Sequence, residues 1–322
     1  MDYRRLGRTG LKVSPLCLGA MMFGERGNAN HDECVRIIHR AIDAGINFID
    51  TANVYSHGES EKIVGSALRD RRDSVVLATK VHGKMGERPN DQGNSRVHIL
   101  REVENSLRRL QTDYIDLYQI HRPDPETPID ETLRALDDLV ASGKVRYIGS
   151  STFAAWEIVE AQWVSDKHDL ARFDCEQPPY SIFVRGIERD VLPACKKYGI
   201  GVIPWSPLNR GWLAGKYRQG QPIDPESRVG RNDAFIDSPD SPTGRKKLEL
   251  VEQLIPMSQE LGASLAQYAL AWTLANPVIT APIIGPRTMQ QLEDNLPALD
   301  VKIPQAHLQR IDDLVPLGTD LQ

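Results

Sequence analysis

The sequence has few cysteines, no long apolar run and no cluster of basic residues. Its four cysteines, Cys17, Cys34, Cys175 and Cys195, show no CxxC or zinc-like spacing, which favours single buried thiols over disulfides or a metal site. No apolar stretch approaches the roughly 20 residues of a membrane helix, and the N-terminus lacks the apolar core of a signal peptide. The formal net charge of −5 argues against nucleic acid as a partner. We therefore expect a cytoplasmic protein with no membrane or nucleic-acid partner.

Three functional motifs are also absent. The eight histidines form no HExxH, so we expect no bound metal. No GxGxxG follows a strand-like run, which counts against a doubly wound dinucleotide-binding fold. GWLAGK at 211–216 is one residue short of a Walker A loop and lacks its Ser or Thr, which excludes that type of phosphate loop.

The chain instead repeats a strand followed by a helix. The eight strand-like runs are PLCLG, INFID, VVLATK, YIDLYQIH, VRYIGSS, RFDCEQ, GIGVIPWSP and TAPIIG. Helices are expected after them, near residues 31–44, 59–69, 95–110, 129–141, 153–165, 186–198, 212–217 and 289–296. Eight such units predict an α/β protein with a single (β/α)8 TIM barrel domain over residues 1–322.

Other segments are expected in addition to the eight strand–helix units. An N-terminal β-hairpin is expected around the turn at residues 7–10, with extra helices near 245–261, 264–275 and 305–314. Residues 218–244 are rich in Pro, Gly, Asp and Ser, and a loop this long inside a domain is usually a lid or a disordered segment. Trp156, Trp163 and Trp272 fall within expected helices and should pack in the interior.

Polar residues end three of the strands. Asp50 ends INFID, Lys80 ends VVLATK and His121 ends YIDLYQIH, and Tyr55 follows five residues after Asp50. The carboxyl ends of parallel strands meet at one rim, so these four side chains should converge there. A lysine ammonium favours the phenolate of a neighbouring tyrosine, and an aspartate keeps that lysine charged. The set could protonate an oxygen that gains negative charge, as in carbonyl reduction, but hydride must come from a nicotinamide.

Several stretches closely resemble the aldo-keto reductase superfamily. They are GINFIDTANVYSHGESEKIVGSAL, LATKVHG, IDLYQIHRPD, VRYIGSSTF, IPWSPLNRGWLAGKY and PIIGPRTMQQLEDN, in the family's order. The resemblance runs from the first hairpin to residue 296. It implies a TIM barrel with NADPH extended across the carboxyl rim. It also implies Tyr55 as general acid, Lys80 and Asp50 as its tuning pair, and His121 as the orienting donor.

The same resemblance implies where the cofactor is held. Ser151, Thr152 and Gln177 stand where the family grips the nicotinamide carboxamide, although threonine replaces the usual asparagine, and Trp205 stands at the aromatic position that stacks on the ring. Gly285 stands where many members have a lysine for the 2′-phosphate, and Arg287 could supply that charge, so NADP is favoured and NAD is possible. The implied cofactor-binding residues are Gly19, Ala20, Met21, Asp50, Ser151, Thr152, Gln177, Trp205, Ser206, Leu208, Asn209, Arg210, Gly211, Lys216, Gly285, Arg287, Thr288, Gln291 and Asn295.

The substrate is expected to be a small carbonyl compound. The residues expected to bind it are Phe23, Tyr55, His82, His121 and Arg122. Two other functions stay open. Potassium-channel β subunits keep this fold and tetrad but serve chiefly by binding a membrane partner, and other relatives reduce keto groups of nucleotide-linked sugars. The sequence leaves the physiological substrate and the oligomeric state open.

Overall fold

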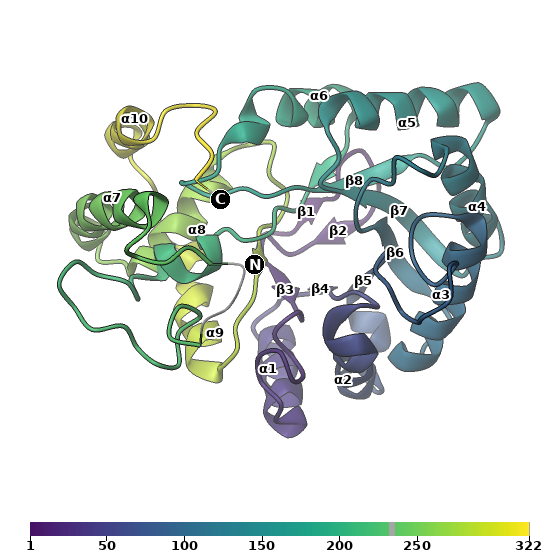
Figure 1. The fold of residues 1–322 in the computed structure, drawn as a ribbon, viewed down its shortest axis with the longest axis horizontal. Helices are drawn as coiled ribbons and strands as arrows, with labels where there is room; N and C mark the ends of the chain where they lie inside the picture. The colour runs from purple at the N-terminus through teal and green to yellow at the C-terminus, as the bar shows by residue number, and fades with distance from the viewer. Residues whose placement is uncertain (232–235, 322) are drawn as a thin grey trace.

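The computed structural model describes residues 1–231 and 236–321, and eight parallel strands lie at its centre (Figure 1). The strands are β3 (Cys17–Gly19), β4 (Phe48–Asp50), β5 (Val76–Val81), β6 (Ile115–Ile120), β7 (Val145–Ser151), β8 (Phe173–Gln177), β9 (Gly201–Val202) and β10 (Ile283–Ile284). They are hydrogen-bonded in the order β10-β3-β4-β5-β6-β7-β8-β9. Backbone bonds from Thr280 N to Val202 O and from Ile283 N to Pro204 O join the two ends of this sheet.

Helices surround the strands. They are α1 (His31–Asp43), α2 (Glu59–Leu68), α3 (Arg96–Leu110), α4 (Ile129–Ala141), α5 (Ala155–His168), α6 (Val191–Tyr198), α7 (Pro242–Glu260), α8 (Leu265–Ala275), α9 (Met289–Asn295) and α10 (Gln305–Leu314), with 3-10 turns η1 (Tyr55–Gly58), η2 (Arg72–Ser74), η3 (Gly186–Glu188), η4 (Asn209–Ala214) and η5 (Leu296–Leu299). Capping side chains set several starts, as Asn30 accepts from Glu33 N before α1 and Ser95 accepts from His98 N before α3. The predicted (β/α)8 barrel is confirmed.

The predicted N-terminal hairpin is also confirmed. It consists of antiparallel β1 (Arg4–Arg5) and β2 (Lys12–Val13). Its turn docks on the barrel through Arg8 N, which donates to Gly199 O at 2.7 Å. Only glycine fits at Gly7, where φ is +57° and a Cβ would lie 2.4 Å from Gly199 O. The hairpin thereby adds buried Leu6 to the apolar cluster inside the barrel.

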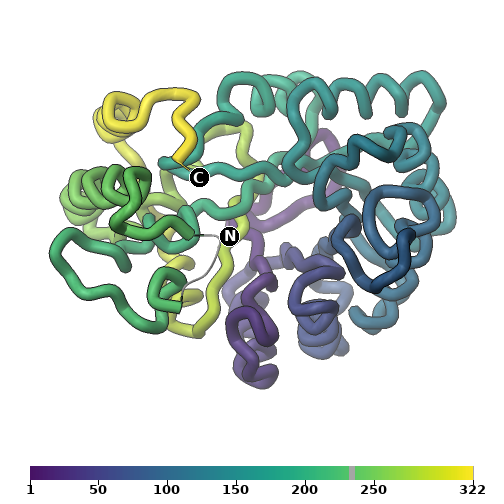
Figure 2. Tube along the Cα trace, viewed as in Figure 1, coloured from purple at the N-terminus to yellow at the C-terminus, as the bar shows by residue number. Residues whose placement is uncertain are grey.

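The C-terminal part departs from the expected boundaries. The helix expected near 212–217 is the 3-10 turn η4 instead, because Arg210 and Gly211 inside it have left-handed backbone. Helix α7 starts three residues before the expected 245, where Ser241 caps it. In Figure 2 the yellow C-terminal tail returns toward the teal chain that follows β8, and Arg185 N donates to Thr319 O there.

The expectations for tryptophans and cysteines had different outcomes. Trp272 is buried as predicted, but the prediction is wrong for Trp156 and Trp163, which are 66% and 60% exposed. Both lie on the outer side of α5, whose inner side buries Ile158, Ala161 and Val164. All four cysteines are buried and unpaired. Within residues 1–231 and 236–321, no helix has the length and apolarity to cross a membrane, and no group of metal-ligating side chains gathers.

The loop expected over residues 218–244 is shorter, because α7 takes its last residues. Its first end is held by Arg218, whose guanidinium donates to both Glu252 carboxylate oxygens at 2.8 Å. Its last end is held by the pair of Lys247 and Asp237. Four residues of this loop, 232–235, lie outside the described chain.

Candidate active site

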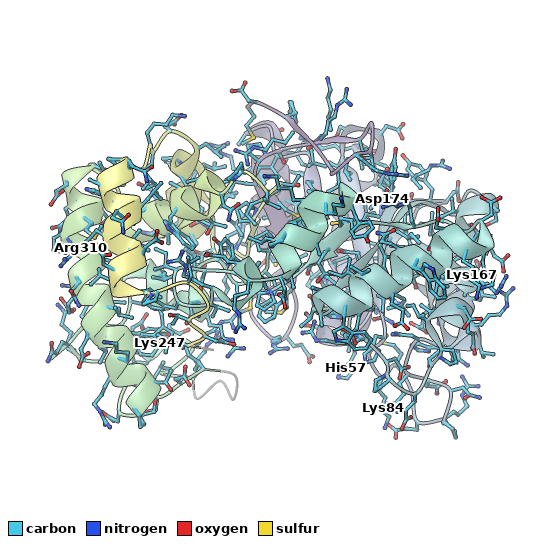
Figure 3. The ribbon with its side chains drawn as sticks, turned by 90° about the horizontal axis from the view of Figure 1, so that it is seen from above. His57, Lys84, Lys167, Asp174, Lys247 and Arg310 are labelled. Carbon is cyan, nitrogen blue, oxygen red and sulfur yellow. The ribbon has the colours of Figure 1, made fainter. Side chains whose placement is uncertain are left out.

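The strand-end residues converge at one end of the barrel. Asp50 is the last residue of β4, Lys80 lies one residue before the end of β5, and His121 directly follows β6. Tyr55 opens η1, in the loop after β4. In Figure 3, His57 and Lys84, which follow β4 and β5, lie on the opposite side of the barrel from Asp174 near the start of β8. The four predicted side chains therefore share the carboxyl rim.

Lys80 connects Asp50 with Tyr55. Its buried ammonium donates to Asp50 Oδ1 at 2.5 Å, to Thr51 O at 2.8 Å and to Tyr55 Oη at 3.1 Å. Burial alone would lower the pKa of Lys80, but the Asp50 carboxylate and Tyr55 raise it above its ordinary value. All three ammonium hydrogens are used. Because Tyr55 Oη accepts from Lys80, the phenolic hydrogen can point to another acceptor.

His121 places a second donor beside the phenol. Its ring centroid lies 5.7 Å from that of Tyr55, with the two planes 80° apart. Burial and the positive charges of Lys80, Arg122 and His82 hold the pKa of His121 well below its ordinary range. The imidazole is therefore neutral near neutral pH, with one N–H and one acceptor nitrogen.

Two buried glutamines hold the second oxygen of Asp50. Gln119 Nε2 and Gln177 Nε2 donate to Asp50 Oδ2 at 3.1 and 3.0 Å, and Gln177 Nε2 also donates to Gln119 Oε1 at 3.1 Å. Sequence reasoning found Gln177 but missed Gln119. The signal was present, because side chains alternate along a strand and Gln119 is two residues before His121. A polar side chain in a buried strand needs a partner, and Asp50 is that partner.

A buried ionic cluster supports the turn that carries Tyr55. Arg109 on α3 donates to Glu61 Oε2 at 2.5 Å and to Glu102 Oε2 at 3.4 Å, and Asn53 Nδ2 donates to the same Glu102 oxygen. Gly58, at the end of η1, allows the close approach of this guanidinium, since a Cβ there would lie 2.7 Å from Arg109 Cδ. Sequence reasoning missed this cluster, whose members come from three separate segments.

The residues expected to meet the nicotinamide lie beside the tetrad. Ser151 Oγ donates to Gln177 O at 2.9 Å, and the Thr152 hydroxyl accepts from Arg122 Nη1 at 2.9 Å. Thr152 has a φ of +63°, a conformation that a β-branched residue rarely adopts, so this turn is strained. The Trp205 ring is half-buried, and its centroid is 5.8 Å from Arg122 Cζ. These side chains form one continuous group with Asp50 through Gln177.

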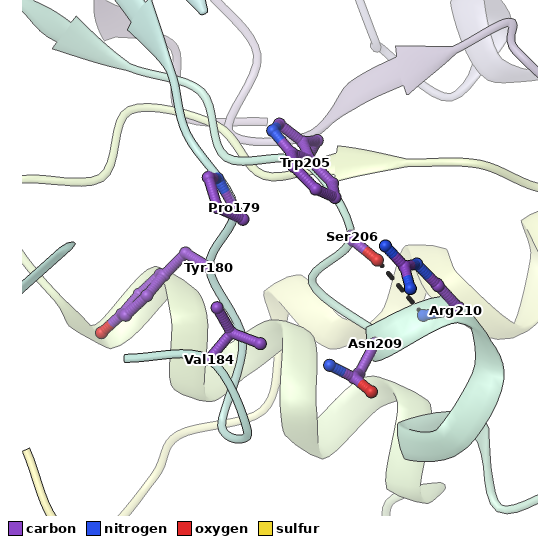
Figure 4. Close-up of a pocket in the computed structure, with 7 residues that line it drawn as sticks. All are labelled: Pro179, Tyr180, Val184, Trp205, Ser206, Asn209 and Arg210. Atoms are coloured by element: carbon purple, nitrogen blue, oxygen red, sulfur yellow. Dashed lines mark hydrogen bonds between the residues drawn. The ribbon is translucent and has the colours of Figure 1, made fainter. Parts of the chain in front are cut away.

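A tight turn follows Trp205 and lines a pocket. Ser206, Asn209 and Arg210 have φ values of +58°, +45° and +58°, and Arg210 N donates to Ser206 Oγ at 3.2 Å. Figure 4 shows Trp205, Ser206, Asn209 and Arg210 on one side of this pocket. The other side is formed by Pro179, Tyr180 and Val184. Leu208 and Gly211 belong to the same turn, which brings this predicted segment together.

Cations gather near the turn after β10. Burial and the charges of Arg287, Arg231 and Arg228 lower the pKa of Lys216, while Asp224 opposes them. Arg287 also forms an ion pair, at 3.9 Å, with the largely exposed Glu226. The backbone of this turn is fixed, because Arg287 N donates to Gln291 Oε1 at 2.8 Å and Thr288 caps α9. Sequence reasoning did not find Arg228 and Arg231, because they lie in an aperiodic loop.

The remaining predicted residues are divided between rim and core. Ala20 N donates to Asp50 O at 2.8 Å, which places Gly19, Ala20 and Met21 beside the tetrad. Phe23 has no exposed surface, so we leave it out of the proposed substrate-binding set. Asn295 is buried on α9. His82 is half-buried at the rim, with Nδ1 3.0 Å from Asn94 Oδ1.

Comparison with known proteins identifies the family of this chain. A model described as the aldo/keto reductase family matches residues 15–316. The chain belongs to the aldo/keto reductase family. It is 43% identical to the uncharacterized oxidoreductase YrpG of Bacillus subtilis (strain 168), over 98% of this chain and 96% of that protein.

Other members of the family carry more specific names. The chain is 40% identical to a probable voltage-gated potassium channel subunit beta of Oryza sativa subsp. japonica, over 94% of this chain and 92% of that one. It is 36% identical to the versiconal hemiacetal acetate reductase of Aspergillus parasiticus, over 97% and 96% of the two chains. The family prediction is confirmed, and the chain is an oxidoreductase of this family.

Proposed function

We propose that this aldo/keto reductase transfers hydride from NADPH to the carbonyl group of aldehydes or ketones, with Tyr55 as the proton donor. One observation carries the proposal. Lys80 Nζ donates to Tyr55 Oη at 3.1 Å, so the phenolic hydrogen is available to an oxygen in the mouth of the site. The name of the Aspergillus parasiticus relative, a reductase, supports this direction of reaction.

The residues around the tetrad fit a nicotinamide dinucleotide. The half-exposed face of Trp205 and the hydroxyls of Ser151 and Thr152 suit an aromatic ring that bears a carboxamide. The cations at Lys216, Arg228, Arg231 and Arg287 suit its phosphates. When bound, this cofactor supplies the hydride that no side chain can supply.

The chain's own residues would then act on the carbonyl oxygen. Tyr55 delivers its proton to that oxygen, and the neutral His121 donates a hydrogen bond to it, which stabilises the negative charge that develops there. The resulting phenolate is stabilised by the Lys80 ammonium, which Asp50 holds in place. Gln119 and Gln177 fix the orientation of Asp50.

NADP is favoured over NAD as the cofactor. Arg287 is half-buried, and Glu226, its ion-pair partner, is largely exposed, so water screens that pair. A 2′-phosphate placed there would meet Arg287 with Lys216 close by. A free 2′-hydroxyl would gain little from the same cations. We therefore expect tighter binding of NADPH than of NADH.

The test is a screen of aldehydes, ketones and keto-sugars with NADPH and NADH side by side. Turnover is followed by the loss of reduced nicotinamide, and cofactor binding is measured separately by calorimetry. Rapid consumption of NADPH with a reactive aldehyde is the expected result. If no carbonyl compound is reduced while NADPH binds tightly, the proposed reaction is wrong.

That last outcome would favour a second candidate, a cofactor-binding regulatory subunit. Its support is the relative of Oryza sativa subsp. japonica named as a probable channel β subunit. An intact tetrad does not separate the two functions. Tight retention of cofactor without turnover would favour the regulatory subunit. The screen measures both turnover and cofactor binding.

A further inference from the structure

Arg122, next to His121 at the rim, uses only part of its hydrogen-bonding capacity within the protein. Its Nη1 donates to His121 O at 2.8 Å and to Thr152 Oγ1 at 2.9 Å, with Ser151 Oγ at 3.5 Å. All of these acceptors are neutral. Among the described residues no hydrogen bond from Nε or Nη2 to protein is present, and no carboxylate lies within ion-pairing distance. A planar edge with two donors is thus available to a ligand.

The acids around Arg122 do not neutralise it. Asp50 is already bound to Lys80, Gln119 and Gln177. Burial raises the pKa of Glu176 to about 8, so this carboxyl is mostly protonated at neutral pH. Burial also lowers the pKa of Arg122, although Tyr55 and Glu176 oppose that shift.

Asp124, two residues after Arg122, already accepts hydrogen bonds from neighbouring loop residues. Its oxygens accept from Asn94 N at 2.9 Å, from Thr127 Oγ1 at 2.8 Å and from Glu126 N at 3.1 Å. Arg122 itself is held in place, since its carbonyl oxygen accepts from Asn94 Nδ2 at 2.9 Å. The rim therefore holds a fixed, half-buried cation that forms no ion pair with any described carboxylate.

The location of this cation points to the substrate. The guanidinium lies over the Trp205 ring, 5.8 Å from its centroid, and close enough to Tyr55 for an electrostatic interaction with that side chain. A carbonyl oxygen bound at Tyr55 would leave the rest of a small substrate beside Arg122. An anionic group on that part would meet two free donors of opposite charge in a partly desolvated site, where such pairs are strong.

We propose that Arg122 binds a carboxylate carried by the substrate, so that this enzyme prefers aldehydes or ketones that bear a carboxylate group a short distance from the carbonyl. This inference rests on the proposed reductase function. The fork of the guanidinium matches the two oxygens of a carboxylate, which selects this anion and fixes the orientation of the carbonyl.

A matched pair of substrates tests the proposal: para-carboxybenzaldehyde and its methyl ester, which has nearly the same shape and no charge. The wild type should have the higher kcat/KM with the acid. In Arg122→Met the kcat/KM for the acid should fall by about tenfold or more, and that for the ester by much less. Arg122→Lys keeps the charge but loses the planar guanidinium. Its kcat/KM for the acid should therefore lie between the values of the wild type and Arg122→Met. Arg310→Met is the control for net charge, because Arg310 lies on α10, far from His57 at the rim (Figure 3).

An equal loss for acid and ester in Arg122→Met would overturn the proposal and leave Arg122 a support for the Ser151–Thr152 turn. Calorimetric binding of benzoate to the protein without cofactor separates this inference from the proposed reaction. Binding that Arg122→Met abolishes and Tyr55→Phe retains supports the anion site even if no carbonyl is reduced. Binding that both variants retain, or none in the wild type, counts against the site.

Discussion

The two halves of the barrel rim hold their predicted residues in different ways. In the half formed by β4 to β8, the side chains of Asp50, Lys80, Tyr55, Gln119 and Gln177 bind one another directly. In the other half, β9 and β10 have two residues each. Ser206, Asn209 and Arg210 lie in a left-handed turn after β9, and cations gather near the turn after β10. The side chains of the first half are bound to one another, whereas the second half brings several cations close together. Substitutions in the first should therefore change rate, and those in the second should change affinity.

The strongest test of this contrast is Tyr55→Phe. The variant removes the proposed proton donor but keeps the ring beside His121. A positioned general acid contributes about a hundredfold to ten-thousandfold, so kcat for any accepted carbonyl should fall at least about a hundredfold. The dissociation constant of NADPH, measured by fluorescence quenching, should stay within about twofold. Near-wild-type turnover in this variant would remove Tyr55 from the chemistry.

Arg287→Ala tests the other half. Loss of a charge-assisted contact to the 2′-phosphate costs about 1.5–3 kcal/mol, which corresponds to about tenfold or more in the dissociation constant. We expect this weakening for NADPH and little change for NADH, with kcat at saturating cofactor nearly unchanged. Lys302→Ala, at an exposed position, is the matched control for charge. If the binding of NADPH and NADH weakens equally, Arg287 has only a general electrostatic role.

Much of the first half could be predicted from the sequence, and the reason is geometric. Apolar strands with a polar last residue and a helix behind them specify a parallel barrel, and its rim then collects Asp50, Lys80 and His121. The contacts of Gln119 could also have been predicted, because side chains alternate along a strand and Gln119 therefore lies on the same face as His121. The sequence does not reveal which side chains that are far apart along the chain form ion pairs or lie close together. Nothing in the order of residues connects Arg109 with Glu61, or the loop residues Arg228 and Arg231 with Lys216.

Two local features could likewise not be predicted from the sequence. Thr152 adopts a left-handed backbone that propensity would not assign to threonine, and its contacts with Gln177 and Arg122 hold it there. Trp156 and Trp163 are exposed although tryptophan is usually buried. In both cases tertiary context overrides the usual preference of the residue type.

Gln119→Leu tests whether the amides that hold Asp50 also support the binding of cofactor. The substitution removes a donor to Asp50 Oδ2 and the acceptor that holds Gln177, so both kcat and NADPH affinity should fall several-fold. The free energy of unfolding should also fall by about 1–3 kcal/mol, because buried polar partners are lost. Gln162→Leu is the matched control, since Gln162 is a buried glutamine on α5 whose Nε2 donates to Phe173 O. An equal loss of kcat in both variants would show that the effect is only structural.

Glu176→Gln should affect activity least and instead change how stability depends on pH. Glu176 lies on β8 and accepts from Ser150 Oγ at 2.5 Å, and burial raises its pKa from 4.5 to about 8. Between these two values the unfolded chain has released this proton and the folded chain retains it, so rising pH favours unfolding through this group. Above about pH 8 both states are ionised and the penalty stops growing.

Glutamine cannot ionise, so the variant should lack this part of the pH dependence. The difference in unfolding free energy between Glu176→Gln and the wild type should grow from about pH 5 to about pH 8, in favour of the variant, and then level off. Its full size is on the order of a few kcal/mol. Denaturant titrations across this pH range measure it, with Glu160→Gln, at an exposed position on α5, as the control. Parallel stability profiles for wild type and Glu176→Gln would mean that Glu176 ionises in the folded protein as readily as in the unfolded chain.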